Sequence, residues 1–274
     1  MRIQTQAPAL FVPHGAPTFA LQPGEAGAAM TRFVGRLARP RAVLVVSAHW
    51  ETAVPTLGVV PRPETMHDFY GFPDELYAIR YPVAGAVAEA MDARTLLEEA
   101  GLTVALDTRR GLDHGAWIPL RQIFPDADIP VVTLSVQPHL GPAHHYRVGE
   151  ALAPLRDAGV LVIGSGNLTH NLGHFHQLRG ADRPPAYVEA FQDWVRDRLE
   201  AGDVDALLNY RQRAPGAVDA HPTDEHLLPF YVALGAAGRD VATETVYRGV
   251  EYNMLAMDTY AFWPGSQDFT GGAA

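Results

Sequence analysis

Three histidines, His14, His49 and His170, each follow a short apolar run that predicts a buried β-strand. In an open α/β sheet, ligands bind in the crevice beyond the carboxyl ends of the strands. A single histidine after a strand is more often an ordinary turn residue. Three of them, each flanked by small residues that let the backbone approach closely, favour a shared site. We therefore expect these imidazoles to lie together.

The chemistry of such a site is restricted by the composition. The sequence contains twelve histidines and no cysteine, so a metal ion here must be held by imidazole, carboxylate or water. Imidazole suits iron as well as zinc. Its unperturbed pKa near 6.5 also makes it the side chain best able to accept and return a proton at neutral pH.

A fourth candidate segment runs from His221 to His226. We expect a helix to begin at Thr223, with Thr223 as N-cap and Glu225 in the first turn, where the helix dipole favours acids. Successive helical residues point about 100° apart, so the segment is expected to supply a single metal ligand. The residues leave open whether this ligand is His221, Glu225 or His226.

Two loops add candidates for substrate contact. Asp113 and His114 stand in a segment bounded by glycines, which predicts a turn. The proline- and aromatic-rich stretch 61–81 predicts a long ordered loop, and loops of that length are usually functional. Its aromatic side chains can stack on a flat ring, or can pack on one another as a small core of the loop itself.

Charge and hydropathy exclude several partners. The formal net charge is −10 and every basic residue is an arginine, so the field of the chain repels polyanions such as nucleic acid. No apolar run approaches the roughly 20 residues that span a bilayer, and the N-terminus does not resemble an export signal. These features predict a cytoplasmic protein that binds no nucleic acid and no membrane.

The elements that must position the histidines alternate along the chain, which predicts a single α/β domain over residues 1–274, with residues 265–274 as a flexible tail. The expected architecture is a three-layer one, with a mostly parallel or mixed sheet flanked by helices on both faces. The predicted strands are Ala9–Val12, Ala42–Ser47, Thr56–Val60, Val131–Val136, Val160–Ile163 and Val241–Tyr247. The predicted helices are Gly27–Ala38, Pro82–Ala100, His144–Ala158, Pro185–Ala201 and Thr223–Ala237.

Several short motifs, taken together and in order, resemble the class III extradiol ring-cleavage dioxygenases, in particular the 4,5-DOPA dioxygenase branch of the LigB superfamily. Each motif alone is weak, but the series covers nearly the whole chain. The motifs are Pro13-His14-Gly15-Ala16-Pro17, Ser47-Ala48-His49-Trp50, His67-Asp68-Phe69, Gly71-Phe72-Pro73, Asp113-His114-Gly115, Gly166-Asn167 with His170-Asn171, and Thr223-Asp224-Glu225-His226, followed by the tail Glu251–Met257.

The resemblance implies roles for particular residues. His14, His49 and His226 would bind one divalent metal, and His170 would be the catalytic histidine and a fourth ligand in the absence of substrate. His114 would lie near the substrate. The loop residues taken as substrate-binding are His67, Tyr70 and Phe72.

The resemblance also implies the reaction. The enzyme would insert both atoms of O2 into a small catechol, DOPA-like or another aromatic diol, and give a ring-opened semialdehyde. The metal would be Fe(II) in function, with Zn(II) as the alternative. Other readings are a zinc hydrolase on the same scaffold, with a metal-activated water, or a non-catalytic binding protein. Arg80, Arg109 and Arg110 are candidates to receive a substrate carboxylate.

Overall fold

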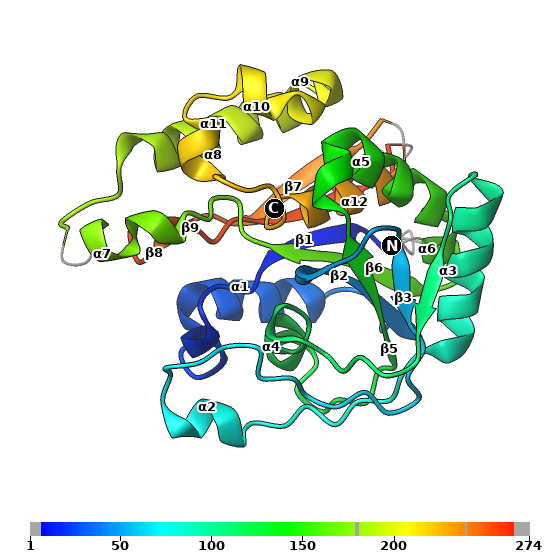
Figure 1. The fold of residues 1–274 in the computed structure, drawn as a ribbon. Helices are drawn as coiled ribbons and strands as arrows, with labels where there is room; N and C mark the ends of the chain where they lie inside the picture. The colour runs from blue at the N-terminus through cyan, green and yellow to red at the C-terminus, as the bar shows by residue number, and fades with distance from the viewer. Residues whose placement is uncertain (1–6, 179–180, 239, 266–274) are drawn as a thin grey trace, which may run out of the picture.

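The sheet at the centre of the molecule has eight strands in the order β4-β3-β5-β2-β6-β1-β10-β7 (Figure 1). The computed structural model describes residues 7–178, 181–238 and 240–265. A separate two-stranded ribbon is formed by β8 and β9. The strands are β1 (Ala9–Pro13), β2 (Ala42–Glu51), β3 (Thr56–Gly58), β4 (Ala105–Asp107), β5 (Val131–Val136), β6 (Val160–Gly166), β7 (Ala242–Tyr247), β8 (Val250–Glu251), β9 (Leu255–Ala256) and β10 (Thr259–Trp263).

The centre of this sheet is parallel. Strand β6 pairs in parallel with β2 on one side and with β1 on the other, and β5 continues the parallel run beyond β2. The apolar residues of these strands are buried on both faces, as expected for central strands of an α/β sheet. The edge is antiparallel, because β10 pairs antiparallel with both β1 and β7.

Helices cover both faces of the sheet (Figure 1), and the sheet separates the apolar core into two clusters. On one face α3, α5, α8 and α12 pack on the strands, and on the other α1 and α4 do so. The helices are η1 (Pro17–Ala20), α1 (Gly24–Val34), α2 (Asp74–Ala78), α3 (Val87–Glu99), α4 (His114–Ile123), η2 (Pro138–Leu140), α5 (Gly141–Leu152), α6 (Pro154–Asp157), η3 (Leu172–His174), α7 (Phe175–Leu178), α8 (Ala186–Glu200), α9 (Val204–Leu208), α10 (Tyr210–Arg213), α11 (Ala217–Ala220) and α12 (Leu228–Ala236).

The predicted three-layer α/β fold with a mixed sheet is confirmed, and all six predicted strands are present. Strand β5 has the predicted bounds, and the other five differ from the prediction at one end. Strands β2 and β6 continue three or four residues beyond the predicted ends at Ser47 and Ile163. Strand β10 is fully buried and its residues are aromatic or small, and it was not predicted from the sequence. Of the predicted tail, residues 266–274 lie outside the described residues.

Two predictions around the candidate site were wrong. Asp113 and His114 do not form a simple turn, because Asp113 is the N-cap of helix α4 and accepts a hydrogen bond from the Ala116 amide. Pro119 inside this helix obscured it in the sequence. Helix α12 begins at Leu228 rather than at Thr223, so the preceding residues form a turn and not a first helical turn.

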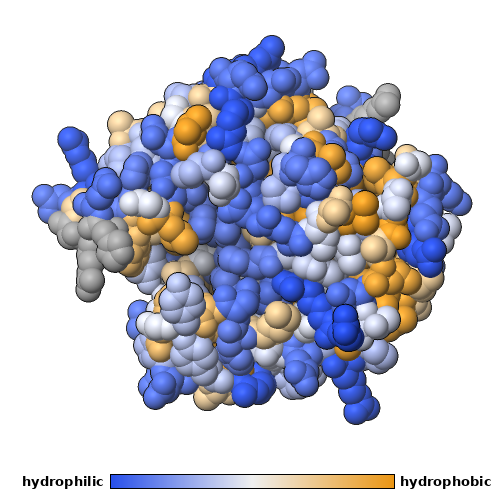
Figure 2. All heavy atoms as spheres, viewed as in Figure 1, coloured by the Kyte–Doolittle hydropathy of each residue, from blue (hydrophilic) through white to orange (hydrophobic). Residues whose placement is uncertain are grey.

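In the part of the chain that the structure describes, no helix is long and apolar enough to cross a bilayer. On the face seen in Figure 2, hydrophilic residues cover most of the surface and apolar residues lie in scattered groups.

Candidate metal centre and substrate cavity

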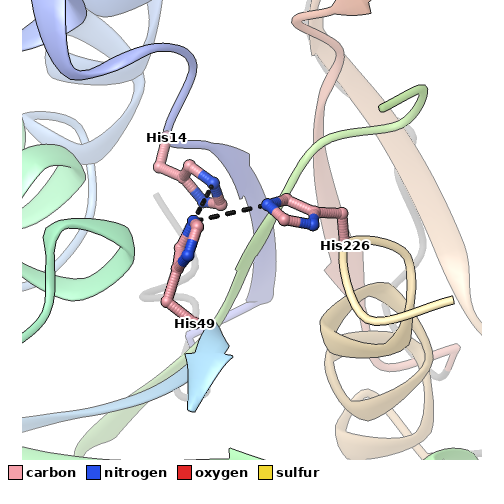
Figure 3. A group of neighbouring side chains, drawn as sticks. All are labelled: His14, His49 and His226. Atoms are coloured by element: carbon pink, nitrogen blue, oxygen red, sulfur yellow. Dashed lines mark hydrogen bonds between the residues drawn. The ribbon is translucent and has the colours of Figure 1, made fainter. Parts of the chain in front are cut away.

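Three histidines from separate segments meet at the carboxyl edge of the parallel strands (Figure 3). His14 directly follows β1, and His49 lies near the end of β2. These two strands flank β6, and the parallel register aligns the three strand ends. His226 comes from the turn before α12. Fold topology therefore explains how residues more than 200 positions apart lie together.

The approach of His226 depends on the lack of a side chain in β6. A β carbon on Gly166 would lie 2.0 Å from the His226 carbonyl oxygen, which instead accepts a hydrogen bond of 3.0 Å from the Asn167 amide. A β carbon on Gly164 would lie 2.1 Å from the Pro229 carbonyl oxygen. Glycine at both positions lets the start of α12 pack directly on the strand, and this packing places the His226 ring.

The three rings direct their Nε2 atoms at a common point. His49 Nε2 lies 3.0 Å from His14 Nε2 and 3.3 Å from His226 Nε2. Donors about 2.1 Å from a metal ion are about 3.0 Å apart when they subtend a right angle, and about 3.4 Å apart at a tetrahedral angle. The observed separations fall within this range, so the donor set fits a single divalent cation.

Burial keeps these imidazoles neutral. Burial lowers the pKa of His14 well below its usual range, and the neighbouring His49, His114 and His170 lower it further. Burial likewise lowers the pKa of His226, with His170 as the next cause. The pKa of His49 is lowered by burial and by His114, against the opposing effect of Asp68. Neutral rings offer the lone pairs that a metal ion requires.

The two other predicted histidines also line this site. The His170 ring stacks on His226 with centroids 3.4 Å apart and planes 5° apart. Burial, followed by the charge of His114, lowers the pKa of His170 to about 4. His114 lies beside His49, with ring centroids 3.9 Å apart. His170 belongs to a separate group with Glu225 and His226, and not to the group that includes His14 and His49.

Asp68 connects the histidines on the substrate side. Its Oδ1 accepts a hydrogen bond of 2.8 Å from the His114 amide and lies 3.0 Å from His114 Nδ1. Its Oδ2 lies 3.9 Å from His49 Nδ1. Burial opposes ionisation of Asp68, but its contacts with His114 outweigh that effect and lower the pKa to about 2. Asp68 belongs to the motif His67-Asp68-Phe69, but no role was predicted for it from the sequence.

The alternatives for the third ligand are separated by their hydrogen bonds. Glu225 Oε1 lies 2.9 Å from Nδ1 of His226, the ring nitrogen that faces away from the other histidines. His221 is fully buried, and its Nε2 lies 2.8 Å from the Leu168 carbonyl oxygen. In this geometry Nε2 of His226 is directed at the common point. Glu225 contacts the opposite ring nitrogen of His226, and the His221 ring contacts the Leu168 carbonyl oxygen instead of the other histidines.

A cavity of about 850 Å³ opens beside the three Nε2 atoms. Its floor is formed by the histidines and its walls are largely apolar, with three carboxylates among the lining residues. Together with His14, His49, His114, His170 and His226, the described lining comprises Gly15, Ala16, Pro17, Thr18, Ala48, Glu51, Asp68, Phe69, Phe72, Leu172, Phe175, Glu225, Tyr252, Met254 and Leu255.

Of the three residues predicted to bind substrate, only Phe72 lines this cavity. Tyr70 is 91% exposed and points to solvent. His67 Nε2 lies 3.1 Å from the Ile79 carbonyl oxygen, and the ring packs with Phe69 and Trp117 in the small core of the loop. The loop thus faces the cavity through Asp68, Phe69 and Phe72, and neither Tyr70 nor His67 is among the described lining residues.

None of the three arginines named as carboxylate receptors belongs to the described lining of the cavity. Arg110 instead donates to Asp113 Oδ2 and to the His49 carbonyl oxygen, and its guanidinium lies over the Trp50 ring. Arg80 donates to the carbonyl oxygens of Tyr77 and Ile79. Both have structural partners.

Comparisons with known proteins agree with this geometry. Residues 9–262 match the family model described as the catalytic LigB subunit of aromatic ring-opening dioxygenase. Proteins named 4,5-DOPA dioxygenase extradiol from Beta vulgaris and Escherichia coli K12 are 40% and 38% identical to the chain; each alignment covers 92% of this chain, and 95% and 93% of the relative.

The same name is carried by a Mirabilis jalapa protein that is 41% identical over 84% of this chain and 85% of its own. A crystal structure of an uncharacterized Escherichia coli K12 protein superposes with a TM-score of 0.77 at 31% identity, over 93% of this chain and 99% of that one.

Proposed function

Because the chain belongs to the LigB family of aromatic ring-opening dioxygenases and is an extradiol ring-cleaving enzyme, we propose that it opens a small catechol at a divalent metal held by His14, His49 and His226. The observation that carries this proposal is the convergence of three neutral Nε2 donors on the floor of an open cavity. The product would be a ring-opened semialdehyde.

The oxygen-dependent ring opening of the family favours iron as the functional metal. Three histidine donors leave open coordination positions on either Fe(II) or Zn(II). When bound, the ion would lower the pKa of the catechol hydroxyls and bring diol and O2 together. Zn(II) binds the same donors, so the identity of the metal is a separate question from the identity of the ligands.

The chain's own residues would manage the protons. His170 lies in the cavity, and its low pKa leaves it neutral at pH 7, so it is able to accept a proton from a catechol hydroxyl. His114 stands on the other side of the ion site, beside Asp68, and would orient the substrate or the bound oxygen. The rings of Phe69 and Phe72 would stack on the catechol and exclude water.

The charge of the cavity supports a substrate with an amino group, such as a DOPA-like catechol. Glu51, Asp68 and Glu225 lie in the lining, and no arginine is among its described residues. Burial and the negative charge of Glu225 raise the pKa of Glu51. An ammonium group would be attracted to this field, whereas a catechol whose only charge is a carboxylate would be repelled.

The test is oxygen uptake by protein reconstituted anaerobically with Fe(II), followed by a panel of catechols monitored for the yellow ring-opened product. We expect one O2 consumed per catechol, with dopamine and DOPA turned over at higher kcat/KM than 3,4-dihydroxyphenylpropionate. Glu51→Gln removes one negative charge from the cavity lining, so it should reduce the difference in kcat/KM between these substrates. Absence of oxygen uptake with every catechol would refute the proposal.

A further inference from the structure

A neutral imidazole binds a metal only through the ring nitrogen that carries no proton, so a ligand histidine needs the correct tautomer. In His226 the nitrogen remote from the other histidines, Nδ1, lies 2.9 Å from Glu225 Oε1. An ionised carboxylate only accepts hydrogen bonds. Thr223 Oγ1 also donates to Glu225 Oε1, at 3.1 Å, and helps to hold the carboxylate. The His226 proton therefore lies on Nδ1, and Nε2 carries the lone pair.

In His14 the same tautomer, with the proton on Nδ1, is fixed by a hydrogen bond to a hydroxyl group. Its Nδ1 lies 3.2 Å from Ser165 Oγ, which is fully buried in β6. Ser165 donates its single proton to the Gly115 carbonyl oxygen at 2.5 Å. The hydroxyl oxygen is then an acceptor toward His14, so the His14 proton also lies on Nδ1.

Pro119 explains why the Gly115 carbonyl receives that proton. In helix α4 this carbonyl would ordinarily accept the amide hydrogen of the residue four positions later. That residue is Pro119, which has no amide hydrogen. The proline inside the helix thus leaves a buried acceptor beside β6, and the Ser165 hydroxyl satisfies it.

His49 differs from the other two. The nearest carboxylate oxygen, Asp68 Oδ2, is 3.9 Å from its Nδ1, beyond hydrogen-bonding distance. Its Nε2 lies 3.0 Å from His14 Nε2. Since His14 Nε2 carries a lone pair, His49 Nε2 can donate to it in the metal-free protein. Hydrogen bonds to Ser165 and Glu225 therefore fix two of the three tautomers, and no carboxylate among the described residues lies close enough to Nδ1 of His49 to fix the third.

We infer that Ser165 and Glu225 are positioning residues, which hold His14 and His226 with a lone pair on Nε2 directed at the cation site. This inference rests on the proposed role of these histidines as metal ligands. The two residues act through the histidine rings and contact no reacting atom. Their loss should weaken metal binding by 10-fold or more, the range found for partners of metal-ligating histidines.

The first test needs no change at the two positions. Nitrogen-15 NMR of the metal-free protein at pH 8 reports which ring nitrogen is protonated, and His14→Gln and His226→Gln assign the signals by their loss. We expect His14 and His226 to be protonated on Nδ1, and His49 on Nε2 or as a mixture. Protonation of either His14 or His226 mainly on Nε2 would overturn the inference.

The second test is the affinity for Zn²⁺, measured by competition with a chelator. Ser165→Ala and Glu225→Ala should each raise the Kd at least 10-fold, and the ring signal of His14 or His226 should become a mixture of tautomers. Glu225→Gln keeps an oxygen acceptor without the charge, so it should recover part of the affinity.

Two control variants separate positioning from other effects. Ser135→Ala removes an equally buried strand hydroxyl that contacts Thr52 and Gln137. Glu51→Gln removes one of the other cavity carboxylates. The change in Kd for Zn²⁺ in this variant measures how much metal affinity is lost when a negative charge is removed without loss of a histidine partner. A Glu51→Gln loss as large as that of Glu225→Ala, or an unchanged Kd in Ser165→Ala, would count against the inference. If the unaltered protein binds no Zn²⁺, the ligand proposal fails instead, and the NMR result still decides the tautomers.

Discussion

Gly115 is the position where one added methyl group tests the whole arrangement around His49. A β carbon there would lie 2.5 Å from Ser47 Oγ, 2.9 Å from His49 Cδ2 and 3.3 Å from Asp113 Oδ1. Carbon atoms in contact normally stand about 3.5–4.0 Å apart, so the His49 ring must move by roughly 0.6 Å or more. Cδ2 is bonded to Nε2, and the nitrogen moves with it.

The expected size of the effect follows from these contacts. Metal sites tolerate ligand displacements of about 0.2 Å, so Gly115→Ala should weaken metal binding 10-fold or more. Overpacking costs about 1–3 kcal/mol, and loss of the 2.6 Å bond from Ser47 to Asp113 adds about 1 kcal/mol. Helix propensity alone predicts that Gly115→Ala raises the free energy of unfolding, since alanine is favoured over glycine inside a helix by about 1 kcal/mol.

The assay compares the Kd for Zn²⁺ and the free energy of unfolding of the metal-free protein. Gly58→Ala is the matched control: Gly58 lies in β3, its β carbon would meet Thr133 Oγ1 of β5 at 2.4 Å, and none of the three nearest atoms belongs to a histidine. The control should lose stability and keep its metal affinity. A Gly115→Ala variant that is more stable than the unaltered protein and binds metal equally well would refute the reasoning.

Three further predictions concern single side chains. His170→Ala should retain the metal and lose about a hundredfold or more in turnover, and loss of metal with unchanged turnover per bound ion would contradict the role of base. His49→Ala should abolish stoichiometric metal binding by elemental analysis, and full occupancy would exclude it as a ligand. Burial raises the pKa of Asp258 to about 6. Ionisation of this buried carboxyl therefore destabilises the native state progressively as pH rises from about 4 to about 6, and the loss of stability persists at higher pH. Asp258→Asn should therefore gain about 2–3 kcal/mol in urea unfolding at pH 8 but little at pH 4, and an equal difference at both pH values would contradict it.

The parallel strands were predictable because their signal is local. The continuous apolar runs before His14 and His49 predict strands buried on both faces, and parallel strands align their carboxyl ends. The alignment of strand ends was therefore sufficient to predict that His14 and His49 lie together. Helix α4 was not predicted because Pro119 lies inside it and proline is unusual in a helix interior. Strand β10 was not predicted because it is a short, largely aromatic run near the end of the chain.

Contacts between distant segments were decided only by the tertiary structure. The sequence left three candidates for the third donor, and the turn that packs against Gly166 directs His226 at the common point. Ser165 meets a histidine 151 positions away. Such pairs depend on which face of a strand meets which helix, and on which backbone acceptors are left unsatisfied. Local patterns of residue type specify elements, whereas the direction of each proton is specified by partners that only the packed chain brings within hydrogen-bonding distance.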